Sequence, residues 1–208
     1  MSPFPVRMED HWSLQPGVDP ARARIMWLIL FEDHPQVAEL ARVAHTRLSG
    51  LACLDLVPEE WLHMTTLIAG FADDIAPVQI NIMISEARRI LAHTSAITIK
   101  LGRVLYHPRA VMLDAGPAHD LEPVLNAARA ATSIATGWDG ELYHKPWVPH
   151  ITLAYSNSVH PAAPVIEALG RQLPRREVRI RSISLVSQTH EQMWTWHPIA
   201  TLPFGRAR

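Results

Sequence analysis

The sequence is poor in cysteine and in lysine. Cys53 is the single cysteine among 208 residues, which excludes a disulfide within the chain and predicts a fold that needs no oxidising compartment. Its apolar neighbours predict a small buried side chain rather than a reactive thiol. Lys100 and Lys145 are the lysines among 19 basic residues. Arginine, which can bind a phosphate through two parallel hydrogen bonds, supplies the remaining positive charge.

Long apolar runs and a strong net charge are also missing. No run approaches the roughly eighteen residues of a membrane span, and the N-terminus has no apolar core of a signal peptide. The sequence therefore predicts a cytoplasmic protein without a membrane partner. The net charge of −1 argues against a nonspecific polyanion binder, because such proteins usually carry a clear basic excess. A small or terminal phosphate group remains compatible with this charge.

The common signatures of cofactor and metal sites are absent as well. There is no glycine-rich phosphate loop, no His-Glu-x-x-His and no pair of cysteines. A metal site would have to assemble from residues far apart in the chain. We therefore expect no metal and no cofactor, and a metal enzyme is the less favoured alternative.

A short pattern of histidine and threonine occurs twice. The copies are His63-Met64-Thr65-Thr66 and His150-Ile151-Thr152-Leu153, 87 residues apart, and each lies in an apolar run. If both runs are strands, side chains two apart point to the same face, so each strand presents one imidazole beside one hydroxyl. A single copy recurs by chance in many proteins, but the pair at this separation indicates a shared site.

Two histidines and two threonines in one site suit a displacement reaction at phosphorus. Imidazoles titrate near neutral pH, so one ring can accept a proton while the other donates one. The two threonine hydroxyls can hydrogen-bond the oxygens of a phosphate.

The two copies resemble the signature of the two-histidine (2H) phosphoesterases, which include the RNA 2′,3′-cyclic phosphodiesterases and the proteins called 2′-5′ RNA ligases. That signature is two copies of His-x-Thr/Ser-x separated by about one lobe. The second copy matches it well, including Pro149 directly before His150. The first copy departs at Thr66, where the family form has an apolar residue such as leucine. The resemblance spans about residues 22 to 200.

The resemblance implies an α+β fold of two lobes, in which two antiparallel-rich sheets flank a central cleft and the helices lie outside. It also implies that His63, Thr65, His150 and Thr152 are catalytic, and that each motif strand lies centrally in its lobe. The implied reaction is metal-independent hydrolysis of a 2′,3′-cyclic phosphate to a 2′-phosphate. His150 would take the proton from water and His63 would give one to the departing ribose oxygen. Run backward, the same groups would perform 2′-5′ ligation.

The order of elements predicted from periodicity agrees with two similar halves. Residues 1–21 are proline-rich and predict a loosely attached arm, residues 22–200 a single bilobal domain, and residues 201–208 a tail. Within the domain we expect strands and helices alternating as a quasi-duplication. The predicted strands are 25–31, 61–69, 96–106, 109–114, the second motif run, 178–185 and 193–201. The predicted helices are 34–49, 80–91, 121–132 and 161–173.

The alternation of side chains along a strand predicts which neighbours of the motif residues lie on the same face. It predicts that Leu67 shares the face of His63 and that Ala154 shares the face of His150. Tyr155 would then lie on the opposite face, where core packing is favoured over stacking on a base.

Other candidates for substrate binding are weaker. Trp61 and Trp147 each precede a motif histidine and either frame the cleft or pack in the core, with packing favoured. Lys145 and Arg103 either supply positive charge to a phosphate or only solvate the surface.

Two functions from different classes remain. The favoured one is the cyclic phosphodiesterase, a monomer acting on an RNA terminus or a small cyclic nucleotide, with no protein partner implied. The alternative is a non-catalytic module on the same fold that binds a nucleotide or an RNA end. The presence of both histidines and both threonines favours the enzyme, because a pure binder could replace either imidazole.

Overall fold

The computed structural model describes residues 4–13, 19, 21–142, 146–189 and 195–205. Helices and strands alternate along this chain, and the paired strands are antiparallel. The helices are α1 (Pro35–Leu48), η1 (Glu59–Trp61), η2 (Ala72–Asp74), α2 (Pro77–Leu91), α3 (Ala118–Thr136) and α4 (Ala163–Leu169). The strands are β1 (Arg7–Met8), β2 (Arg24–Leu30), β3 (Leu54–Leu56), β4 (His63–Phe71), β5 (Ile97–His107), β6 (Ala110–Asp114), β7 (His150–Ser156), β8 (His160–Pro161), β9 (Gln172–Ile180), β10 (Ser182–Gln188) and β11 (His197–Pro203).

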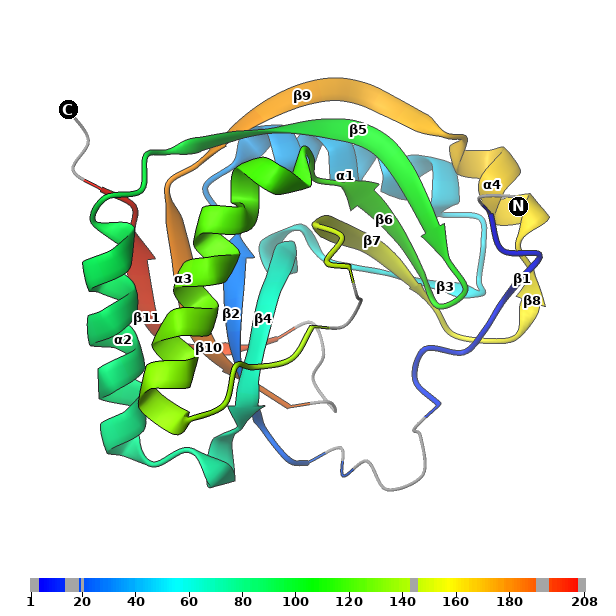
Figure 1. The fold of residues 1–208 in the computed structure, drawn as a ribbon. Coiled ribbons are helices and arrows are strands. Elements are labelled where there is room, and N and C mark those ends of the chain that lie inside the picture. Colours follow the sequence, from blue (N-terminus) through cyan, green and yellow to red (C-terminus); the bar gives the residue numbers. More distant parts are fainter. Residues whose placement is uncertain (1–3, 14–18, 20, 143–145, 190–194, 206–208) are drawn as a thin grey trace.

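Two curved sheets form the body of the molecule. The four-stranded sheet has the order β11-β10-β2-β4, and the five-stranded sheet has the order β3-β7-β6-β5-β9. In Figure 1, β5 and β9 arch over the top, while β2 and β4 run upright beneath them. The predicted α+β architecture of two antiparallel sheets is confirmed. The expectation that both motif strands lie centrally is wrong for β4, which is an edge strand; β7 lies between β3 and β6.

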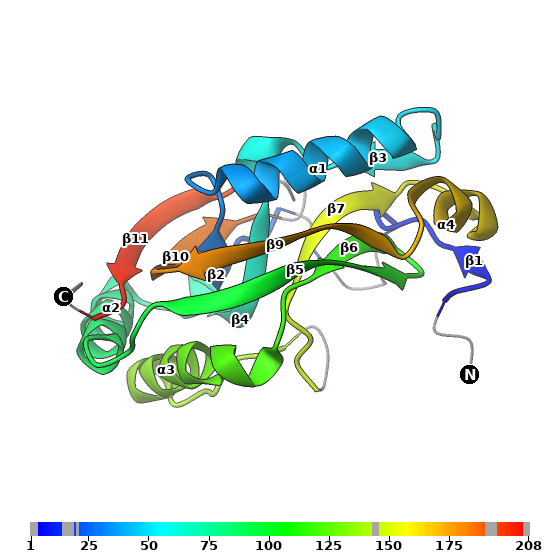
Figure 2. The same ribbon diagram turned by 90° about the horizontal axis from the view of Figure 1, so that it is seen from above.

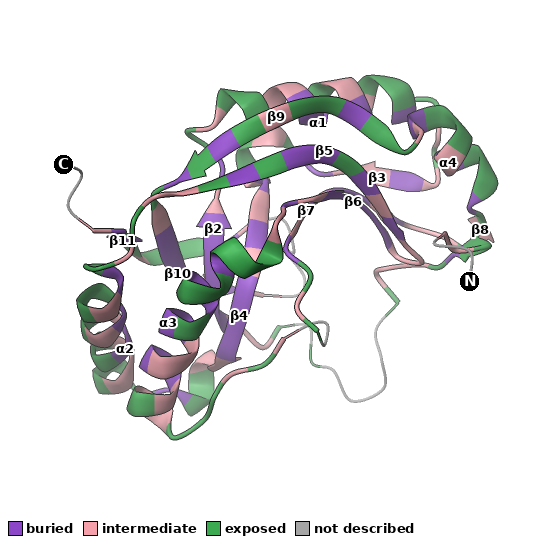
Figure 3. Cartoon of the chain, turned by 45° about the horizontal axis from the view of Figure 1, so that its top comes forward, coloured by how far each residue is buried: buried purple, intermediate pink, exposed green. Residues whose placement is uncertain are grey.

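The helices cover the outer faces of the sheets. Helices α2 and α3 pack side by side, α3 against β4 and α2 against β11, whereas α1 contacts β9 and α4. Seen from above, α1 and α3 lie on opposite sides of the strands (Figure 2). In α3, Leu121, Val124, Leu125 and Ala128 recur at helical spacing and are buried, which is why this helix packs onto the sheet. Figure 3 shows the burial concentrated on the strands and on the inner faces of the helices.

The predicted strand 178–185 is in fact two strands. Val178 and Ile180 belong to β9 of the five-stranded sheet, whereas Ile183 and Leu185 belong to β10 of the four-stranded sheet. The side chains that join the main core shift from positions 178 and 180 to positions 183 and 185, so one continuous strand could not have kept all four on one face. The chain therefore crosses between the sheets at this point.

The chain ends are better packed than the sequence predicts. Among residues 1–21, the described segment 4–13, which we call the N-terminal strap, contributes β1 to a pairing with β8 and buries Met8 completely. It is therefore docked rather than loosely attached. At the other end, β11 continues to Pro203 and buries Leu202, so the domain extends into the predicted tail.

Candidate active site

A β-bulge in β4 sets the direction of the first motif. His63 pairs with Leu30 and Thr65 with Leu28 on β2, but the next pair is Leu67 with Trp27, so Thr66 is the extra residue. His63 and Thr65 share one face, as predicted.

The residues after this bulge change faces. Leu67 packs with Trp27 in the main core, and Ile68 packs in a second apolar cluster with Leu28 and Trp196. The prediction that Leu67 shares the face of His63 is therefore wrong, because the bulge breaks the alternation.

Thr66 is completely buried at this bulge, and its Oγ1 makes no hydrogen bond with any described residue. A buried hydroxyl without a partner carries a desolvation cost of about 1–3 kcal/mol. Thr66→Val keeps the shape and removes the hydroxyl, so we expect it to raise the free energy of unfolding by about 1 kcal/mol, measured by urea denaturation.

The matched control for this variant is Thr132→Val, because the buried Thr132 Oγ1 accepts a hydrogen bond from Trp27 Nε1 at 3.0 Å. Removing a bonded hydroxyl should lower stability. Equal losses in the two variants would show that the Thr66 hydroxyl has a partner.

A second bulge in β7 changes the position of Tyr155. On β6, Asp114 pairs with His150, Met112 with Thr152 and Ala110 with Tyr155, and Leu153 is the extra residue. Because residues 110, 112 and 114 alternate along β6, His150, Thr152 and Tyr155 share one face. Ala154 turns to the core instead. The predicted faces of Ala154 and Tyr155 are therefore wrong, and Tyr155 lies beside the motif.

Both motif rings are held in the same way. The Nδ1 atom of His63 lies 2.9 Å from the Trp61 carbonyl oxygen, and that of His150 lies 2.7 Å from the Val148 carbonyl oxygen. A carbonyl only accepts hydrogen bonds, so Nδ1 carries the proton of each neutral ring, and Nε2 is then the basic nitrogen. Each ring is thus fixed by the carbonyl two residues before it.

The two motifs meet across neighbouring parts of β4 and β7. Thr65 and His150 line the same small pocket, and Trp147 Nε1 donates a hydrogen bond of 3.2 Å to the Thr65 carbonyl oxygen. Ile68 and Glu141 also exchange backbone hydrogen bonds of 2.8 and 2.9 Å. Glu141 and Trp147, which precede the second motif, therefore both bond to β4. Trp147 therefore connects the residues before the second motif to β4, and it also lines the pocket.

His63 is partly buried in an aromatic environment. The ring of Trp196 lies edge-on to it, with centroids 4.9 Å apart, and Trp61 packs edge-on against Trp196 at 4.8 Å. Burial lowers the pKa of His63 from its ordinary value of 6.5 to about 4. The hydrogen bond to the Trp61 carbonyl raises this pKa, and the neighbouring charge of His150 lowers it. This coupling shows that the two rings lie close enough to interact.

The His63 ring should consequently titrate at about pH 4, measured from its imidazole proton resonances by NMR in the absence of ligand. Because the folded pKa lies below the unfolded one, this ring contributes stability above pH 6.5 that is lost as pH falls toward 4. Titration near 6.5 would contradict the burial described above.

The other residues predicted to bind substrate are Arg103, Trp61, Trp147 and Lys145. Arg103 lies beside the second motif: its Nε is 3.7 Å from the Asp114 carboxylate, and Asp114 is the cross-strand partner of His150. Trp61 and Trp147 contact the site as described. Lys145 lies outside the described residues. Asp114 and Trp196 were missed because strand pairing places Asp114 beside His150 and ring packing places Trp196 beside His63, and neither leaves a local sequence pattern.

Comparison with known proteins identifies the family. The model of the 2′-5′ RNA ligase superfamily matches residues 32–192, which include both motifs. The chain belongs to the 2′-5′ RNA ligase superfamily. A search of curated proteins by sequence finds no match.

Several solved structures share the fold of this chain. TT0787 of Thermus thermophilus superposes with a TM-score of 0.64 at 17% identity, covering 88% of this chain and 100% of that one. E. coli LigT complexed with 3′-AMP gives 0.62 at 15% identity, covering 89% and 99%. The PDE domain of MHV ns2 gives 0.58 at 14% identity, covering 79% and 98%. The 2H phosphoesterase family expected from the two motifs is confirmed.

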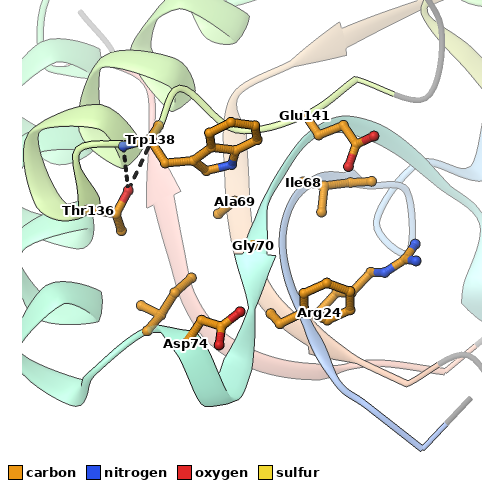
Figure 4. Close-up of a pocket in the computed structure, with 10 residues that line it drawn as sticks. Arg24, Ile68, Ala69, Gly70, Asp74, Thr136, Trp138 and Glu141 are labelled. Carbon is orange, nitrogen blue, oxygen red and sulfur yellow. Dashed lines mark hydrogen bonds between the residues drawn. The ribbon is translucent and has the colours of Figure 1, made fainter. Parts of the chain in front are cut away.

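A second pocket, larger than the one that Thr65 and His150 line, lies further along β4. It is lined by residues that include Arg24, Asp74, Trp138 and Glu141 (Figure 4).

Within the described chain, no helix is long and apolar enough to cross a membrane. The same part of the chain contains no group of three or more His, Cys, Asp or Glu side chains arranged to hold a metal ion.

Proposed function

We propose that this protein hydrolyses a 2′,3′-cyclic phosphate, on a nucleotide or an RNA end, to a 2′-phosphate. The observation that carries the proposal is the equivalent mounting of the two motif rings: each donates Nδ1–H to the carbonyl two residues before it, and Thr65 of the first motif lines the same pocket as His150 of the second. Two basic Nε2 atoms on strands of the two sheets suit an attack on phosphorus with a base on one flank and an acid on the other. The same groups support 2′-5′ ligation in the reverse direction.

The threonines supply the second part of this chemistry. Thr65 lies two residues after His63 on the same face, and Thr152 stands in the same relation to His150. Their hydroxyls would donate hydrogen bonds to the nonbridging oxygens as negative charge builds in the transition state. Arg103, Trp61, Trp147 and Tyr155 would contribute to the walls around this centre.

The electrostatics favour one division of roles. At neutral pH, the low pKa of His63 leaves its Nε2 without a proton, so this ring can accept a proton from water without first losing one. Asp114, opposite His150 on the same face, is placed to stabilise a positive imidazolium, which suits the acid. We therefore propose His63 as base and His150 as acid, the reverse of the roles that the family resemblance implies.

Structures of E. coli LigT that carry 3′-AMP, ATP, NADP⁺ or phosphate support a nucleotide-type substrate for this fold. The alternative, a binding module without turnover, would saturate with nucleotide and release no product. No feature of the site favours it, because both histidines and both threonines are present and share their predicted faces.

The test is an assay with nucleoside 2′,3′-cyclic phosphates in the presence of EDTA, with the product identified by ³¹P NMR. We expect turnover at an unchanged rate with the chelator and a 2′-phosphate as product. Loss of turnover with EDTA would require a metal, and a 3′-phosphate product would require opposite regiochemistry. Binding without any product would support the alternative function.

A further inference from the structure

The N-terminal strap lies before the stretch that the family model matches, yet it is built onto the second lobe. Met8 is fully buried, Glu9 N–H donates to the Pro108 carbonyl at 2.7 Å, and His11 N–H donates to the Ser156 carbonyl at 2.8 Å. Glu9 also forms an ion pair with Arg109 at 3.3 Å. In Figure 1, the strap (blue) passes near the ends of the β5–β6 hairpin and β7.

The strap ends in an aromatic cluster with Tyr155. The ring of His11 stacks on Tyr155 with centroids 4.1 Å apart and planes at 29°. Trp12 lies edge-on to Tyr155 at 5.5 Å and to His11 at 5.1 Å. We call His11, Trp12 and Tyr155 the strap cluster. All three residues are partly exposed.

Trp12 is fixed in place by a hydrogen bond. Its Nε1 donates to Asp55 Oδ2 at 2.7 Å, and Asn157 Nδ2 donates to the other carboxylate oxygen at 2.9 Å. Asp55 pairs with Tyr155 across β3 and β7, so its side chain projects on the face of Tyr155. The indole is therefore held on the side of the sheet that carries His150.

The strap cluster lies next to the second motif. Tyr155 and Thr152 pair with Ala110 and Met112, which are two residues apart on β6 and share one face. Two residues along a strand span about 7 Å. A phosphate at Thr152 would thus place the nucleoside attached to it within reach of the cluster.

We propose that the strap cluster binds the base of a nucleoside 2′,3′-cyclic phosphate, with Trp12 as its principal stacking surface. This inference rests on the proposed function. Every base has a π face that can stack on an aromatic side chain, so the cluster recognises a nucleoside without reading its sequence. The carboxylates of Asp10 and Asp55 lie against Trp12, accepting hydrogen bonds from its backbone N–H and its indole Nε1, and they disfavour a further phosphate group there. The substrate class is thereby narrowed to a single nucleoside carrying the cyclic phosphate.

The experiment compares two substrates in the full chain: adenosine 2′,3′-cyclic phosphate, which has a base, and glycerol 1,2-cyclic phosphate, which has none. The ratio of their kcat/KM values should fall about 10-fold or more in Trp12→Ala, because one stacking contact is lost. Trp12→Phe, which keeps an aromatic ring but loses the bond to Asp55, should retain most of the ratio. Trp138→Ala, at an exposed tryptophan outside the strap, is the matched control.

The outcomes separate this inference from the proposed function. An unchanged ratio in Trp12→Ala, or equal losses on both substrates, would overturn the base-stacking role. If the wild-type protein turns over neither substrate, the proposed function fails, and calorimetric binding of adenosine 2′-monophosphate then tests the cluster by itself. Binding weakened about 10-fold by Trp12→Ala would support it, and binding of equal strength would refute it.

Discussion

Replacing either motif histidine by alanine is expected to lower kcat/KM for a nucleoside 2′,3′-cyclic phosphate by roughly 10²–10⁴-fold, the usual contribution of a positioned acid or base. The rings act on one phosphate from two flanks, so the double variant should be little worse than the poorer single variant. Steady-state kinetics of His63→Ala, His150→Ala and the double variant would check both points. His119→Ala, on an exposed face of α3, is the matched control.

The same variants assign the acid and the base. A 4-nitrophenyl phosphodiester has a leaving group that needs no proton, so the variant that lacks the acid should lose much less activity on it. We expect this partial rescue for His150→Ala and not for His63→Ala. Rescue of His63→Ala instead would restore the roles that the family resemblance implies. Normal activity of the double variant on the cyclic substrate would refute catalysis by the pair.

The threonine hydroxyls are expected to have the next largest effect. Thr65→Val and Thr152→Val should each lower kcat by roughly 10²–10³-fold, because each removes one donor to the charge that develops on the phosphate. The loss should fall mainly on kcat, since the hydroxyls act more strongly on the transition state than on the bound substrate.

The control for these variants is Thr46→Val, because Thr46 bonds a backbone carbonyl in the exposed part of α1, far from both motifs in the chain. A loss confined to KM would show that the hydroxyls bind the substrate without stabilising the transition state. Circular dichroism of each variant would establish that it folds.

The faces of the motif residues could be predicted because the histidine and threonine of each motif are two residues apart, which is the side-chain period of a strand. His63 and Thr65 are two residues apart on β4, and His150 and Thr152 are two apart on β7, so alternation alone puts each pair on one face. The pairs lie before the bulges at Thr66 and Leu153. That is why the shared face of each histidine and threonine pair could be predicted.

The prediction failed beyond those bulges. An extra residue in one strand reverses every later side chain, and nothing in the pattern of Leu67 or Tyr155 shows where such a residue lies. The bulge at Leu153 is what brings Tyr155 to the face of His150, so the strap cluster could not be predicted by alternation.

Long-range pairing was also beyond the reach of the sequence. Asp114 meets His150 only through the register of β6 with β7, and Trp196 meets His63 through packing next to the edge strand β4. The docking of the strap depends on the pairing of β1 with β8, on the buried Met8 and on the bond from Trp12 to Asp55, within a proline-rich stretch that has no periodicity. Such contacts are properties of the assembled sheets rather than of any local pattern.

The central claim is that both imidazoles act on one phosphoryl group. A crystal structure with a nucleoside 2′,3′-cyclic vanadate, which resembles the five-coordinate transition state, would test it most directly. The account predicts the vanadate between the two rings, with the Nε2 atoms of His63 and His150 hydrogen-bonded to oxygens on opposite sides and the Thr65 and Thr152 hydroxyls on the remaining oxygens. Vanadate bound to one ring alone, or bound away from both, would contradict it.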